Sequence, residues 1–181
     1  GGNYLFYDDA STYEIRGKPP IQSDGARFLV AWMDTVNWRI LAARVGLDGT
    51  LLDDPPLVLN GAVTTGGHPS VGFDGANYTV FWIGCGPNMT SWSCTGELYG
   101  VRISPDGAVL DPAPVKLTTG SNAYIRMTGV AYDGAHYLVV WRTPTMTVRG
   151  MRIDASGGGL ANLDAAAGFQ ISAGTGSRYP A

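Results

Sequence analysis

Apolar and polar residues alternate along three segments of the chain, and each segment opens with Asp-Gly-Ala, at Asp24, Asp74 or Asp133. Asp-Gly is a strong signal for a tight hairpin turn, because both residues tolerate a positive φ at low cost. After each turn an aromatic residue, a Val and a Trp occupy every second position, which predicts a β-strand with these side chains on one face. The alternating sets are Phe28, Val30, Trp32; Tyr78, Val80, Trp82; and Tyr137, Val139, Trp141. The residues between them are also largely apolar, so we expect both strand faces to be covered and the three Trp residues to lie in the core.

A second pattern follows each segment and adds two more strands. Segments 41–49, 99–107 and 149–157 each predict a strand that contains an Arg and ends in a Gly turn. A link rich in Leu, Asp and Pro then leads to a last short apolar stretch. Each unit therefore consists of strand, Asp-Gly turn, strand, variable loop, strand, Gly turn and strand. The repeated arginines are expected to make hydrogen bonds or salt links between neighbouring units; they are Arg44, Arg102 and Arg152.

Four antiparallel strands in a unit of roughly 40 to 50 residues are typical of a β-propeller blade. The sequence resembles the β-propeller repeat proteins found among bacterial exported and cell-surface proteins. The resemblance covers about residues 18–181 and rests on two motifs, Asp-Gly-x-x-Tyr-x-Val-x-Trp and Gly-x-Arg-Ile-x-x-Asp-Gly. The resemblance implies an all-β fold of four-stranded antiparallel blades, about three complete and partial ones at both ends. A β-sandwich is the structural alternative. The expected divisions are a partial blade at 1–18, blade 1 at 19–68, blade 2 at 69–126 with the Cys85–Cys94 loop inserted, blade 3 at 127–177, and the start of a further blade at 178–181.

Composition narrows the compartment and the partners. The 181 residues carry a net charge of -3 and contain no basic run, which argues against nucleic acid as a partner. Cys85 and Cys94 are close in sequence and predict a loop disulfide, hence a secreted or extracytoplasmic protein, in the periplasm or on the cell surface; two free thiols are the alternative. A zinc site needs four ligands, and the two cysteines could gain only His68 and His136, which are distant in sequence. The disulfide is therefore the better interpretation of the cysteines, and no metal or other cofactor is expected. No apolar stretch approaches the roughly 18 residues of a membrane span.

The variable loops are the predicted working face. In propellers, the loops between second and third strands share one face with the links between blades, and here these are the segments that differ between units. Function tends to reside on variable loops held by a rigid frame. Loop aromatics can stack on sugars or partner surfaces, although packing within the loop explains them equally well. The candidate ligand-binding residues are Trp38, Asp34, Asn88, Trp92, Arg142 and His68.

An enzymatic site is weakly supported. Most acidic residues belong to repeated turns and links, which leaves Asp34 and Glu97 as a thin supply for the paired carboxylates of glycoside hydrolysis. The sequence therefore favours a non-catalytic extracellular module that engages protein or carbohydrate through its variable face. The alternatives are part of a glycan-active propeller enzyme, a hydrolase or lyase, and an architectural repeat of a surface appendage. Because propellers close with about four to eight blades, we expect either a piece of a larger chain or a ring completed by other copies or another chain. A small ring closed by a terminal strand that joins the first blade is the further alternative.

Overall fold

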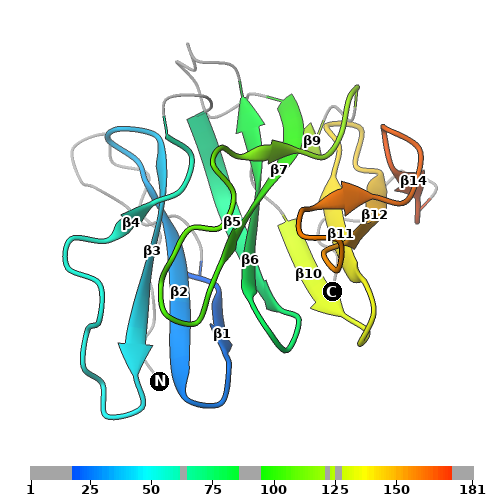
Figure 1. Ribbon diagram of the computed structural model, residues 1–181. Helices are drawn as coiled ribbons and strands as arrows, with labels where there is room; N and C mark the ends of the chain where they lie inside the picture. Colours follow the sequence, from blue (N-terminus) through cyan, green and yellow to red (C-terminus); the bar gives the residue numbers. More distant parts are fainter. Residues whose placement is uncertain (1–17, 62–64, 86–94, 121–122, 125–127, 173–181) are drawn as a thin grey trace.

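The computed structural model describes residues 18–61, 65–85, 95–120, 123–124 and 128–172, and every regular element in these ranges is a β-strand. The strands form three antiparallel sheets side by side, each built from a continuous stretch of chain (Figure 1). Sheet 1 contains β1 (Ile21–Ser23), β2 (Arg27–Asp34), β3 (Arg39–Gly46) and β4 (Leu57–Val58). Sheet 2 contains β5 (Thr65–Phe73), β6 (Tyr78–Cys85), β7 (Thr95–Ile103), β8 (Val115–Lys116) and β9 (Ala123–Tyr124). Sheet 3 contains β10 (Thr128–Tyr132), β11 (Tyr137–Arg142), β12 (Val148–Asp154), β13 (Ala161–Asn162) and β14 (Phe169–Gln170).

Four strands follow one another in chain order across each sheet, as the sequence predicts, so the all-β antiparallel expectation is confirmed. Sheets 2 and 3 each carry a fifth short strand, because β9 also pairs with β7 and β14 also pairs with β12. The predicted last apolar stretch of sheet 3 is β14, while β13 pairs with the other end of β12. The outer edge of sheet 3 is therefore made of two short pieces rather than one strand.

The Asp-Gly turns are held by their own aspartates. Asp24 Oδ1 accepts the backbone N–H groups of Ala26 and Arg27, both at 2.7 Å. The same two bonds recur at Asp74 and at Asp133, with distances of 2.7 and 2.8 Å. The following glycines take φ values of 91°, 94° and 100°, which other residues adopt only with strain. The turn chemistry read from the sequence is the chemistry that closes these hairpins.

Two hydrophobic clusters join the sheets. One cluster places Tyr78, Val80 and Trp82 of sheet 2 against Leu29 and other residues of sheet 1. The second cluster places the corresponding face of sheet 3 against the opposite face of sheet 2; its sheet 3 strand residues include Tyr137, Val139 and Trp141. The aromatic faces of β6 and β11 thus pack on the preceding sheet.

This direction of packing explains a departure from the expected core. Trp82 and Trp141 are fully buried, whereas Trp32 is only half-buried. Trp32 lies on the face of β2 opposite Leu29 and Ala31, which are the residues that meet sheet 2. The expectation that both strand faces are covered holds for β6 but not for β11, where Leu138 is 38% exposed.

Candidate functional site

Each sheet contains one arginine–aspartate pair at its outer edge. In sheet 1, Asp53 accepts the backbone N–H of Arg44 at 2.8 Å and its guanidinium Nη2 at 2.7 Å. Arg102 and Asp111 repeat both bonds in sheet 2, at 2.7 and 2.8 Å, and Arg152 with Asp164 repeats them in sheet 3, at 2.7 and 2.6 Å. In every case the aspartate side chain satisfies a strand N–H for which the broken outer strand offers no carbonyl.

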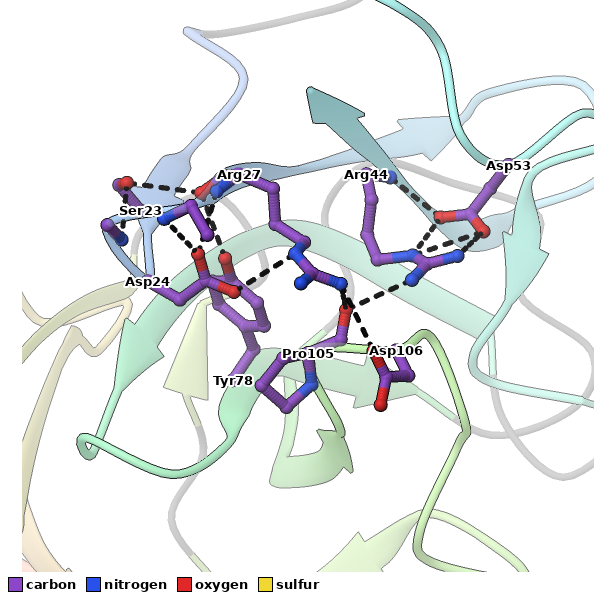
Figure 2. Close-up of polar contacts among 10 residues, drawn as sticks. Ser23, Asp24, Arg27, Arg44, Asp53, Tyr78, Pro105 and Asp106 are labelled. Atoms are coloured by element: carbon purple, nitrogen blue, oxygen red, sulfur yellow. Dashed lines mark hydrogen bonds and ion pairs between the residues drawn. The ribbon is translucent and has the colours of Figure 1, made fainter. Parts of the chain in front are cut away.

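Two of these arginines also reach the next sheet. Arg44 Nη1 donates to the carbonyl of Pro105 at 3.0 Å, in the Gly turn of sheet 2. Arg27 donates to the same carbonyl at 2.6 Å, and Figure 2 shows both guanidinium groups converging on it. Arg102 Nη2 donates to the carbonyl of Gly158 at 2.5 Å, in the corresponding turn of sheet 3. The expected links between units are therefore hydrogen bonds to turn carbonyls, together with an ion pair at 3.2 Å between Arg27 of sheet 1 and Asp106 of sheet 2. The three repeated arginine–aspartate pairs lie within their own sheets.

The electrostatics follow from these contacts. The hydrogen bond from Arg44 outweighs burial and lowers the pKa of Asp53, and the hydrogen bond from Arg152 lowers the pKa of Asp164 in the same way. Burial of the ion pair differs sharply between sheets. The arginine side chain is 13% exposed in sheet 1 and 9% in sheet 2, but 57% in sheet 3.

Of the predicted site residues, Asp34 ends β2 and Trp38 lies in the β2–β3 loop. Asp34 Oδ2 accepts Arg39 Nη2 at 2.6 Å and Asn37 Nδ2 at 2.9 Å. Burial acts to raise the pKa of Asp34, but the hydrogen bonds from Asn37 and Arg39 prevail and lower it to about 2. Trp38 is half-buried with φ of 55°, packs against the cluster between sheets 1 and 2, and its carbonyl accepts Asn60 Nδ2 at 3.1 Å. Hydrogen bonds thus connect the loop residues to β2, β3 and Asn60, and part of Trp38 packs against the core.

The other predicted residues are spread over sheets 2 and 3. His68 lies inside β5, with φ of 23°, where the register with β6 shifts between Gly67 and Ser70. It therefore occupies a β-bulge rather than the residue before a strand. Arg142 ends β11, and its Nη1 lies 2.8 Å from Met146 Sδ. Asn88, Trp92 and Cys94 lie outside the described residues, so the disulfide with Cys85 stays a prediction.

A cleft that the sequence did not indicate lies on the outer face of sheet 3. It has a volume of about 300 Å³ and is lined by apolar and charged side chains from β10, β11, β12 and β14. Leu138, Phe169 and Arg152 form part of its wall, and none of Asp34, Trp38, His68 and Arg142, the predicted ligand-binding residues that the structure describes, lines it. Leu138, the apolar residue between Tyr137 and Val139 of β11, was the sequence signal for an apolar surface here. The sequence alone did not show that no described sheet covers this face.

The described residues contain neither of two further kinds of site, a metal-ligand cluster and a membrane-spanning helix. Among the described residues, no group of three or more His, Cys, Asp or Glu is placed to hold a metal ion. In the same part of the chain, no helix is long and apolar enough to cross a membrane.

Comparison with known proteins adds little. No family model and no curated protein matches the chain. A solved structure of a Bacteroides fragilis NCTC 9343 protein, provisionally named as a 6-phosphogluconolactonase, aligns with 83% of this chain at 14% identity and a TM-score of 0.29. The alignment spans 57% of that protein's length. Similarity this low supports no conclusion about the present chain.

Proposed function

We propose that the three sheets are blades of a β-propeller-type module, and that the module binds an extracellular protein or carbohydrate without converting it. The supporting observation is the contrast between the two ends of the sheets. At the lower end in Figure 1, the three Asp-Gly turns share the same aspartate bonds. At the upper end, the β2–β3 loop carries an Asp34–Arg39 ion pair, whereas the β11–β12 loop carries a cluster of threonine hydroxyls. A constant end is suited to scaffolding and a variable end to recognition.

The state of the carboxylates supports binding over catalysis. Aspartates at the turns and at the sheet edges are each engaged in structural hydrogen bonds. Asp34 is the described carboxylate on the variable loops between second and third strands. With a pKa of about 2 it is ionised at neutral pH, so it is a poor general acid, and both its oxygens accept donors that shape the loop, from Val36, Asn37 and Arg39.

An array of glycans probed with the whole chain tests this proposal. Asp34→Asn breaks the ion pair with Arg39 that shapes the β2–β3 loop, and Arg142→Ala removes a cation from the β11–β12 loop. Each should weaken capture about tenfold. Asp48→Asn is the matched control, because Asp48 accepts the Thr50 N–H in a turn of the opposite end. A ligand that is chemically converted during incubation would refute the non-catalytic role. Capture that neither loop variant changes would refute the variable-face site.

Export is part of the same proposal and has its own test. The predicted disulfide between Cys85 and Cys94 would be formed in an oxidising compartment. Mass spectrometry of non-reduced peptides should find the two cysteines joined in protein isolated from its source. Two alkylated free thiols would contradict the extracytoplasmic assignment.

A further inference from the structure

The outer face of sheet 3 has the features of a sheet-to-sheet contact, but none of the described strands packs on it. The corresponding face of sheet 1 is covered by sheet 2, and that of sheet 2 is covered by sheet 3. At the position between the aromatic residue and Val of the motif, Leu29 and Thr79 are 0% exposed, whereas Leu138 is 38% exposed. Phe169 and Ile171 on the same sheet are 38% and 50% exposed. Large apolar side chains gathered around a cleft mark an interaction surface.

The cleft lies at the place on sheet 3 that corresponds to where the contact between sheets 2 and 3 seats an aromatic ring. A Cβ added to Gly72 of sheet 2 would lie 2.5 Å from Tyr137 Cε1, so the ring of sheet 3 rests on that glycine. Ala131 is the sheet 3 residue in the same place of the motif, and it is exposed and lines the cleft. The cleft beside Ala131 therefore corresponds to the place beside Gly72 where the Tyr137 ring packs.

Arg152 differs from Arg44 and Arg102 in the same way, in its contact with a next sheet. Arg44 and Arg102 each combine an aspartate of their own sheet with a turn carbonyl of the next sheet. Arg152 has the aspartate bonds, and its guanidinium is held in place by Asp164 on a sheet with no described neighbour on this side. An ordered, exposed guanidinium beside an apolar cleft is suited to a partner that offers a carbonyl next to an aromatic ring.

The chain itself carries a surface with these features. The face of β2 turned away from sheet 2 presents Phe28 and Val30, both half-buried. The Gly turn of sheet 1 presents the Leu47 carbonyl at the motif position of Pro105, followed by Asp48 at the position of Asp106. We propose that the outer face of sheet 3 binds sheet 1 of a second copy of this chain, with Phe28 of the second copy in the cleft and Arg152 donating to its Leu47 carbonyl. The inference rests on the stacking of blades in the proposed function, and not on the loop ligand.

The glycines of the turns provide a matched pair of probes. At Gly107, a Cβ would lie 2.6 to 2.8 Å from the Arg44 guanidinium, because that group covers the turn. At Gly49, the same place in sheet 1, no described atom lies within 4 Å of a Cβ, and φ is 85°. Asn tolerates this φ better than other side chains do. Gly49→Asn should therefore fold and obstruct the incoming Arg152.

The first experiment measures the mass of the full chain by light scattering over a range of concentrations, up to about 1 mM. Wild type should reach at least twice 19.1 kDa, since a head-to-tail contact joins two or more copies and gives a closed ring when its rotation closes. Leu138→Glu and Gly49→Asn should each raise the dissociation constant about tenfold or more, because one buries a charge and the other blocks a hydrogen bond.

The controls are substitutions at exposed positions of sheet 2, which has a neighbouring sheet on each face. Val109 of sheet 2 is 42% exposed and Gly75 has no described atom within 4 Å of a Cβ, although sheet 2 has neighbours on both faces. Val109→Glu and Gly75→Asn should leave the mass unchanged. Circular dichroism establishes that each variant is folded, and Arg152→Ala replaces Leu138→Glu if the latter does not fold.

Mixing the two contact variants tests the direction of the contact. One copy with Leu138→Glu and one with Gly49→Asn still form one intact pair of surfaces between them, so the mixture should associate more tightly than either variant alone. A wild type that stays monomeric over the whole range would overturn the proposal. So would an assembly that both variants leave intact. Loss of glycan binding with assembly preserved would fault only the loop site.

Discussion

The outer faces of sheets 2 and 3 carry the same ion pair in different surroundings. Arg102 and Asp111 are 9% and 6% exposed, while Arg152 and Asp164 are 57% and 12% exposed. The Nη2–Oδ1 distances, 2.8 and 2.6 Å, show that the pair forms whether or not a neighbouring sheet covers it. The pair is thus a property of the sheet edge, and the neighbour determines only how much the pair contributes to stability.

The largest expected difference follows from removing the aspartate. Asp111→Ala leaves the Arg102 guanidinium buried without its carboxylate, which should cost about 3 to 5 kcal/mol in the free energy of unfolding. Asp164→Ala should cost much less, because water can solvate Arg152. Urea unfolding at a concentration where the chain is monomeric measures both, and equal losses would show that burial does not control the pair.

The next difference concerns the aromatic seat. Gly72→Leu must displace the Tyr137 ring, so it should lower the free energy of unfolding by about 1 to 3 kcal/mol. Ala131→Leu is the matched change on the exposed face and should alter it by less than about 0.5 kcal/mol. The same unfolding assay compares the two variants. If Ala131→Leu is as damaging as Gly72→Leu, the sheet 3 face is covered in the isolated chain.

The smallest effect concerns acid. The hydrogen bond from Arg152 lowers the pKa of Asp164 below its ordinary 3.8, so the carboxylate contributes stability that is fully present above pH 3.8 and is lost as the pH falls through the lowered pKa. NMR titration of the Asp164 carboxyl carbon should show this low pKa in the wild type and a value nearer 3.8 in Arg152→Gln. An unchanged pKa in the variant would mean that the pair does not stabilise the ionised form.

The candidate site was harder to predict than the strands. Asp34 and Trp38 were identified because they fall outside the repeat, yet Trp38 packs partly into the core. The cleft beside Leu138 was not predicted, since its residues come from four strands and its existence depends on a face that has no described neighbour. Loop residues can be recognised as variable from sequence, but their orientation depends on contacts such as Asn60 with the Trp38 carbonyl.

The sequence by itself determined the strands and turns, because these depend on local rules: period-two alternation, a positive φ at glycine, and an aspartate that accepts the next backbone N–H groups. It did not determine which strand face meets which neighbour. Alternation gives Trp32 and Trp82 the same pattern, yet Trp82 is fully buried and Trp32 is half-buried. Burial depends on the sheet that lies opposite, a contact between residues far apart in the chain. Only the tertiary structure could show that the packing runs in one direction and that no described sheet covers the outer face of sheet 3.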